Sequence, residues 1–245
     1  SSSLIPRFSL NEYLAHEVTH REVSAILRSD LSLLISEFEL EFLQNSLNIS
    51  PDILGHVGYF SEVPFRQVAP RSDDMSDRKN FVCIGNFNHP PNLDCFRILR
   101  DSVWPKLHSK LKTLGHDDVE LHIYGSYPKP SFVQESKKVA NFRVMGHAED
   151  ALVTLSAYRA LLAPIRFGAG IKGKIVDAFH AGTPCMTTSI GAEGMFDISP
   201  LPNCICDNLD NFINSSVDVY TSQTFLVDAA KAYKNLLAEK FSAKV

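Results

Sequence analysis

The feature that most constrains the fold is a regular alternation of short apolar runs with helical patterns from Phe81 onward. The apolar runs, interpreted as strands, start near Phe81, Val119, Phe142, Ala160, Pro184 and Asn203. Strands that alternate with helices form βαβ units, and such units build a parallel sheet flanked by helices. The sequence therefore predicts an α/β fold. Within it, Pro91–Leu114 has the stripe of a helix, and Pro105 either kinks that helix or starts a second one.

The first sixty residues give a shorter pattern of the same kind. We expect a helix over Leu10–Leu27, a buried strand over Leu31–Ile35 and a weak strand over Val57–Phe60. A second helix is expected to start at Ser36, because Glu39 three residues later completes a capping box in which the glutamate reaches back to the serine. This unit is too small to be a complete doubly wound domain.

A polar segment with prolines and many charges separates the two patterns, and it is typical of a linker. A final amphipathic helix is expected over about 222–241. We expect four regions: a remnant of a first α/β domain (1–65), a linker (66–80), a main α/β domain (81–220) and a C-terminal helix that crosses back (221–245).

The residues that follow the expected strands are the candidate functional residues, since parallel sheets bind ligands beyond the carboxyl ends of their strands. The strongest pattern is Gly168–Lys174, which interleaves glycines with Lys172 and Lys174 just before a helix expected at Ile175–Ala181. The amides and dipole of a helix N-terminus, together with two ammonium groups, suit a diphosphate. Asp177, about one turn further on, is placed to accept hydrogen bonds from sugar hydroxyls. A flexible glycine loop with solvated lysines is the alternative.

The segment Ala163–Pro184 resembles the donor-site segment of GT-B glycosyltransferases of the group 1, family 4-like type. The resemblance continues in Gly191–Gly194, Phe81–Gly85, His89–Asn92 and Trp104–Pro105. Less specifically, Arg28–Glu39 is similar to the last strand and helix of that family's N-terminal domain.

This resemblance implies two Rossmann-like domains that face each other across a cleft. It implies an enzyme that transfers a sugar from a nucleotide-diphosphate sugar to a glycan or lipid-linked acceptor, with no required cofactor and no obligatory divalent cation. The lysines would hold the diphosphate, Asp177 the ribose and the backbone around Met145 the base. The strand-end rule and the resemblance together give this expected donor-binding set: Gly85, Asn86, Gly125, Met145, Gly146, Gly168, Gly170, Lys172, Gly173, Lys174, Asp177 and Glu193.

The chain departs from the family pattern in three ways. Many relatives carry two glutamates eight positions apart, but here Ala169 and Asp177 stand at those positions. The loop Asn86–Asn92 has no Lys or Arg, so the two later lysines are expected to take over its work. Measured against that family, we expect much of a normal N-terminal domain, which usually supplies the acceptor site and any catalytic base, to be absent from this sequence. The catalytic residues are therefore unknown, and a non-catalytic, degenerate nucleotide-sugar-binding module is the second hypothesis.

A third hypothesis comes from the HExxH pattern His16-Glu17-Val18-Thr19-His20. On a helix the two histidines would share one face and hold Zn²⁺ while Glu17 activates water, as in a metalloprotease. Glu39 or Glu41 would then be the third ligand. A solvated helix face is the simpler interpretation.

Composition narrows the partners and the compartment. The formal net charge of -4 gives no basic excess, so nucleic-acid binding is not expected. No apolar run approaches the roughly 20 residues that a bilayer requires, and no signal peptide is visible. The five cysteines have no framework spacing, which predicts reduced thiols and a cytoplasmic location. Peripheral membrane contact is left open.

Overall fold

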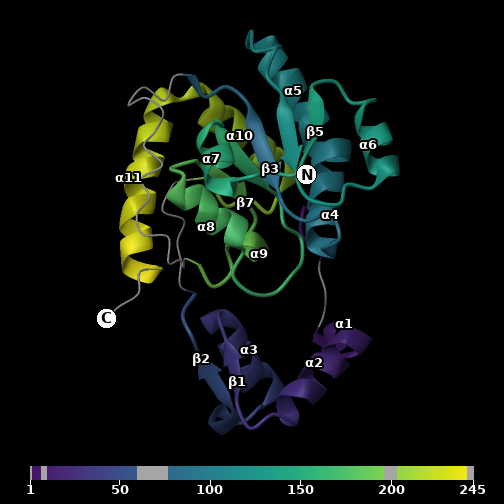
Figure 1. The fold of residues 1–245 in the computed structure, drawn as a ribbon, viewed down its shortest axis with the longest axis vertical. Helices are drawn as coiled ribbons and strands as arrows, with labels where there is room; N and C mark the ends of the chain where they lie inside the picture. The colour runs from purple at the N-terminus through teal and green to yellow at the C-terminus, as the bar shows by residue number, and fades with distance from the viewer. Residues whose placement is uncertain (1, 7–9, 60–76, 196–202, 242–245) are drawn as a thin grey trace.

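The computed structural model describes residues 2–6, 10–59, 77–195 and 203–241. Figure 1 shows a larger part built around a five-stranded sheet and a smaller part, below it in this view, built around a two-stranded sheet. Every strand pairing within the two sheets is parallel. The predicted α/β class is therefore confirmed.

The large sheet has the strand order β5-β4-β3-β6-β7. Its strands are β3 (Phe81–Ile84), β4 (Leu121–Tyr124), β5 (Phe142–Gly146), β6 (Ala160–Ala163) and β7 (Cys185–Thr187). These five match the predicted strand positions. The sixth expected strand, near Asn203, is reduced to a single parallel bridge between Thr187 and Ile205.

Helices connect and flank these strands. They are α4 (Pro90–Ile98), the π-helical turn η3 (Leu99–Val103), α5 (Trp104–Thr113), α6 (Pro130–Ser136), α7 (Ala151–Ser156), α8 (Gly173–His180), α9 (Ser189–Ala192), α10 (Leu209–Thr221) and α11 (Gln223–Lys240). Pro105 lies in the first turn of α5, directly after the π-helical turn. It therefore starts a second helix, which was one of the two predicted alternatives. In the described ranges no helix is long and apolar enough to cross a membrane.

One continuous core holds the larger part together. Trp104 is fully buried and its indole Nε1 donates to the carbonyl of Ala140 at 2.9 Å. Helix α11 packs on α8, and the fully buried Tyr233 of α11 accepts the backbone N–H of Cys185 at 3.0 Å. The five cysteines are free and buried, as predicted.

The smaller part contains α1 (Leu10–Leu14), α2 (Glu17–Leu27), β1 (Ser32–Leu34), α3 (Glu37–Leu47), the 3-10 turn η1 (Pro51–Ile53) and β2 (Leu54–His56). The single helix predicted over Leu10–Leu27 is wrong, because His16 adopts an extended backbone and caps α2. The second strand, β2, lies just before the predicted Val57–Phe60 segment. Phe60 itself lies outside the described residues.

The prediction that Leu31–Ile35 is buried is also wrong. Leu31, Leu33 and Ile35 are 54%, 61% and 41% exposed. A sheet of two strands offers too little structure to cover both of its faces. Only the side that carries Leu34 packs against the small core formed with α3.

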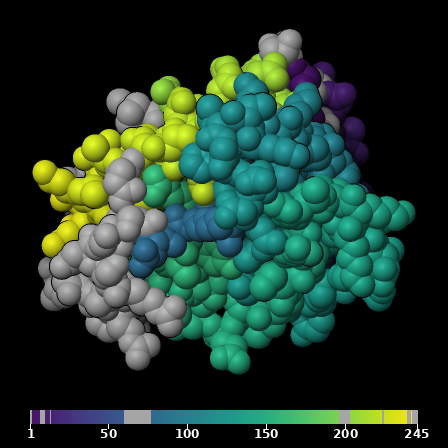
Figure 2. Space-filling view, turned by 90° about the horizontal axis from the view of Figure 1, so that it is seen from above, coloured from purple at the N-terminus to yellow at the C-terminus, as the bar shows by residue number. Residues whose placement is uncertain are grey.

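The first residues do not belong to the smaller part, in contrast to the expected 1–65 division. Leu4 is buried in the core of the larger part, and its N–H donates to the carbonyl of Asp207 at 2.8 Å. Ser3 forms an antiparallel bridge with Asn208. The carbonyl of Ser2 accepts the N–H of Leu209 in α10 at 3.2 Å, and Figure 2 shows purple N-terminal atoms beside the yellow-green atoms of the 203–221 region. Most of the expected linker, residues 66–76, lies outside the described ranges.

The Tyr233 contact predicts a stability effect. Tyr233→Phe leaves the buried N–H of Cys185 without its acceptor, so we expect the free energy of unfolding to fall by about 1–3 kcal/mol. Urea unfolding followed by circular dichroism measures this change. Tyr127→Phe is the matched control, since Tyr127 is 68% exposed and its change should be close to neutral. An equally small effect at Tyr233 would contradict the assigned anchor.

Candidate functional site

The candidate site lies where the order of the large sheet reverses. From β3 the chain builds outward through β4 to β5, then returns to add β6 and β7 on the other side of β3. The loops that follow β3 and β6 therefore diverge and leave a crevice between them, which is where open parallel sheets bind ligands. A cavity of about 350 Å³ occupies this position.

Three segments line this cavity, which we call the switch-point cavity. They are the end of β3 with the start of α4 (Ile84, Gly85, His89, Pro91 and Asn92), the start of α7 (Ala151), and the loop after β6 with the start of α8 (Ile165, Phe167, Gly168, Ala169, Ile171, Lys172, Gly173, Lys174 and Asp177).

Two polar contacts hold the third segment in place against α4. The ammonium of Lys174 donates to Oδ1 of Asn92 at 2.6 Å, and Arg166 forms a two-bond ion pair with Asp94, one bond of 2.8 Å. Gly168 adopts a φ of +124°, and a Cβ there would come within 3.1 Å of the ring of Pro91. The loop thus requires glycine at this point because both its conformation and its contact exclude a side chain.

Lys172 is the exceptional side chain of the cavity. It precedes α8 as its N-cap, it is only 9% exposed, and its Nζ has no hydrogen-bond partner among the described residues. Oε2 of Glu193 lies 4.0 Å from this Nζ. Burial lowers the pKa of Lys172, against the opposing charges of Glu193 and Glu39. A buried ammonium without hydrogen bonds costs free energy, and an anionic ligand at this position would offset that cost.

Three carboxylates lie near this ammonium or in the cavity lining. Glu39 and Glu193 act on the charge of Lys172, and Asp177 lines the cavity. Burial raises the pKa of Asp177, and the charge of Asp150 acts in the same direction. Burial also raises the pKa of Glu39 and of Glu193. These carboxyl groups are therefore partly removed from water, a property common in functional sites.

Glu39 corrects the predicted capping box. The hydroxyl of Ser36 accepts the N–H of Glu39 at 3.4 Å, so the serine half is confirmed. The carboxylate of Glu39, however, does not reach back to Ser36. Its Oε1 accepts the N–H of Gly170, at 3.0 Å, on the loop after β6. Because α3 packs against that loop, the half-buried N–H of Gly170 becomes a hydrogen-bond donor for Glu39. The sequence pattern alone does not show this contact.

The predicted donor-binding residues fall into two groups. Half of the set lines the switch-point cavity: Gly85, Gly168, Lys172, Gly173, Lys174 and Asp177. The other half does not line it: Asn86, Gly125, Met145, Gly146, Gly170 and Glu193.

Gly125 and Asn86 have structural explanations. A Cβ at Gly125 would lie 2.0 Å from the carbonyl oxygen of Gly85, so close backbone packing requires glycine there. Oδ1 of Asn86 accepts the N–H of Asn88 within its own turn. Gly146 accepts the N–H of Gly125 at 2.7 Å, and Met145 is 46% exposed.

The sequence also left some lining residues outside the predicted set. His89, Pro91 and Asn92 belong to the loop and helix start that follow β3, so the strand-end rule marks their region without selecting them. No sequence pattern marks Phe167 or Ala151 as a residue of the cavity lining. For Glu39, the sequence signals were its capping position and its candidacy as a third zinc ligand, and neither points to this cavity.

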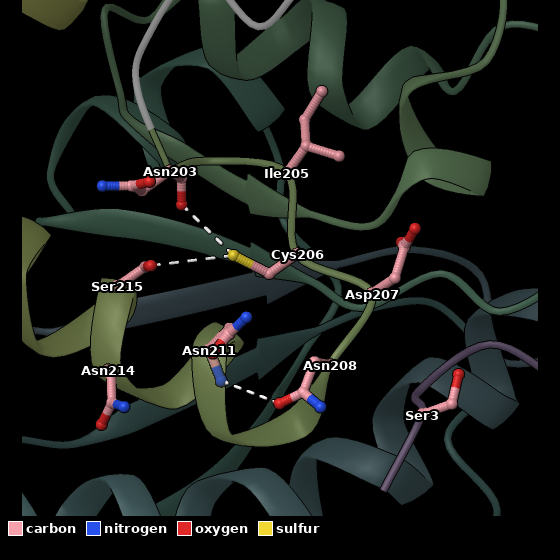
Figure 3. Close-up of a pocket in the computed structure, with 9 residues that line it drawn as sticks. All are labelled: Ser3, Asn203, Ile205, Cys206, Asp207, Asn208, Asn211, Asn214 and Ser215. Carbon is pink, nitrogen blue, oxygen red and sulfur yellow. Dashed lines mark hydrogen bonds between the residues drawn. The ribbon is translucent and has the colours of Figure 1, made fainter. Parts of the chain in front are cut away.

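A second cavity, of about 610 Å³, lies between the first residues, the 203–208 segment and α10 (Figure 3). Asparagine and serine side chains surround it, and Cys206 Sγ lies within it near the carbonyl of Asn203 and the hydroxyl of Ser215. Its described lining includes one carboxylate, Asp207, and no Lys or Arg. It therefore lacks the charge that a diphosphate requires.

The zinc hypothesis finds no support. His16 lies outside α2, and its Nδ1 accepts the N–H of Val18, so it does not share a helical face with His20. Across the described ranges, no group of three or more His, Cys, Asp or Glu side chains is placed to hold a metal ion.

Together the parallel sheet, its switch-point crevice and the buried lysine define an α/β protein whose loop before α8 has features that suit an anion. A family model described as Glycosyl transferases group 1 matches residues 78–211, more than half of the chain. The chain belongs to this family. No curated protein matches the sequence significantly.

Solved structures with the same fold are GT-B glycosyltransferases. A mutant of S. aureus TarM, in complex with fondaparinux, alpha-GlcNAc-glycerol and UDP, has a TM-score of 0.70 at 12% identity, over 97% of this chain and 46% of that chain. WaaG, involved in lipopolysaccharide biosynthesis, has a TM-score of 0.63 at 14% identity, over 95% and 69%. A UDP-forming trehalose-phosphate synthase from Burkholderia xenovorans, in complex with glucose-6-phosphate, has a TM-score of 0.66 at 10% identity, over 96% and 62%. The chain thus spans about half the length of the first of these structures.

Burial of Asp177 predicts a pH-dependent stability. Its folded-state pKa is raised, so ionisation destabilises the folded protein above that pKa, and the cost disappears as pH falls below the ordinary aspartate pKa. Asp177→Asn should therefore stabilise the ligand-free protein near pH 7.5 by up to about 1 kcal/mol. The gain should shrink toward pH 4. Urea unfolding across this pH range measures it.

The exposed Asp228 of α11 provides the control, since Asp228→Asn should change stability by less than about 0.5 kcal/mol at every pH. A loss of stability in Asp177→Asn at pH 7.5 would show that the Asp177 charge is stabilised by its surroundings.

Proposed function

We propose that this chain binds a nucleotide-diphosphate sugar in the switch-point cavity and acts in sugar transfer to a glycan or lipid-linked acceptor. The observation that carries the proposal is the buried ammonium of Lys172, which has no hydrogen-bond partner among the described residues. The family match supports the transfer chemistry. The complex of TarM with UDP supports a nucleotide as the ligand.

The geometry suits the diphosphate of such a donor. The first amides of an α-helix have no partner within the helix and carry a partial positive charge, so the start of α8 attracts anions. Lys172 and Lys174 add two full charges on the same segment. When a sugar is transferred, negative charge grows on the departing phosphate, and fixed ammonium groups stabilise it. We infer that the lysines serve in place of an obligatory divalent cation.

The remaining roles follow from position. Asp177, half-buried in α8 and facing the cavity, is proposed to accept hydrogen bonds from the ribose hydroxyls. The backbone around Met145 and Gly146, at the end of β5, is proposed to meet the base. We also place the protein in a reducing compartment, the cytoplasm, which the five free and buried thiols support.

The two lysines test the proposal. The double change Lys172→Ala and Lys174→Ala should weaken binding of the preferred nucleoside diphosphate (UDP, GDP or ADP) at least 100-fold, because two charge-assisted contacts are lost. Calorimetric titration measures the affinity, and circular dichroism checks the fold. The double change Lys106→Ala and Lys112→Ala, at exposed positions of α5, should alter affinity less than about twofold. Unchanged binding by the Lys172 and Lys174 variant would refute the phosphate assignment.

A further inference from the structure

We propose that Glu39 binds hydroxyl groups of the sugar carried by the donor, so that α3 of the smaller part contributes a specificity-determining residue to the site. The inference rests on the proposed function and deepens it. The nucleoside diphosphate would be held by the larger part, while the sugar would be recognised by both parts of the chain.

The position of the Glu39 carboxylate is the first argument. Its Oε1 accepts the N–H of Gly170 at 3.0 Å. The two neighbours of Gly170, Ala169 and Ile171, both line the switch-point cavity. The carboxylate of Glu39 is therefore fixed within one residue of the cavity lining. Among the described residues, Glu39 forms this one side-chain hydrogen bond, which leaves Oε2 able to accept another.

The docking of α3 is the second argument. Ser36, at the start of α3, is buried, and its hydroxyl would lie 2.5 Å from a Cβ on Gly194. The glycine at 194, with a φ of +72°, lets the start of α3 approach this turn closely. The turn also carries Glu193. As a result, Glu39 and Glu193 both interact electrostatically with Lys172, from opposite parts of the chain.

The charges of the carboxylates and of the ammonium groups favour different parts of the donor. A diphosphate next to Glu39 and Glu193 would be repelled by both carboxylates, so it belongs beside the ammonium groups at the start of α8. A sugar carries several neutral O–H donors, and a carboxylate is an acceptor for them. Ala169, whose side chain is a single methyl group, cannot supply such an acceptor. Glu39, held against the adjacent residue, can.

A purely structural role for Glu39, as a latch between α3 and the loop, is the competing explanation. Glu39→Gln separates the two. The glutamine keeps a carbonyl oxygen to accept the N–H of Gly170, so the latch remains, but it loses the charge and one acceptor oxygen. Glu41→Gln, at an exposed position of the same helix, is the matched control.

The experiment is calorimetric titration of the wild type and both variants with UDP, GDP and ADP and with UDP-glucose, UDP-N-acetylglucosamine, UDP-galactose, GDP-mannose and ADP-glucose. The comparison uses the conjugate that the wild type binds most tightly. We expect Glu39→Gln to weaken binding of that conjugate about tenfold and binding of the matching nucleoside diphosphate less than twofold. Glu41→Gln should change neither.

Three results overturn the inference. They are equal affinity of Glu39→Gln and the wild type for the conjugate, a parallel loss for conjugate and diphosphate, and a wild type that binds no conjugate more tightly than its diphosphate. In these cases diphosphate binding by the wild type leaves the proposed function standing. A folded wild type that binds no nucleotide at all overturns both.

Discussion

The site depends on one buried charge, the ammonium of Lys172. A lysine that is only 9% exposed and has no hydrogen-bond partner among the described residues costs folding free energy in the absence of a ligand. Glu193, at 4.0 Å, offsets only part of that cost. The surrounding core must supply the difference. Such an arrangement is expected where an anionic ligand, when bound, completes the electrostatics.

The topology explains why this charge stands where it does. Because β3 and β6 are neighbours while their following segments leave in different directions, the sheet opens a crevice at their carboxyl ends. The ion pair of Arg166 with Asp94 and the bond from Lys174 to Asn92 tie the loop after β6 and the start of α8 to α4. Helix α3 of the smaller part contacts the same loop, because Glu39 accepts the N–H of Gly170. The loop after β6 is therefore held by segments far apart in the sequence.

Local patterns were enough to predict the sheet and the position of the glycine- and lysine-containing loop before α8. The five strands follow from apolar alternation, and the Gly168–Lys174 loop follows from its glycines and lysines placed before a helix. Local patterns could not predict the features that depend on contacts between segments far apart in the sequence. The burial of Lys172 requires the packed core, the need for glycine at Gly125 comes from the carbonyl of Gly85, and Glu39 is directed to Gly170 only because α3 lies against that loop. The exposure of Leu33 likewise follows from a sheet of only two strands.

The most direct test of this account is a crystal structure of the protein with its preferred nucleoside diphosphate. The account predicts that a phosphate oxygen lies about 3 Å from Nζ of Lys172, the distance of a charge-assisted hydrogen bond. It also predicts the diphosphate at the start of α8, inside the switch-point cavity. A diphosphate bound instead in the cavity of Figure 3, with the Lys172 ammonium still lacking a partner, would contradict the central claim.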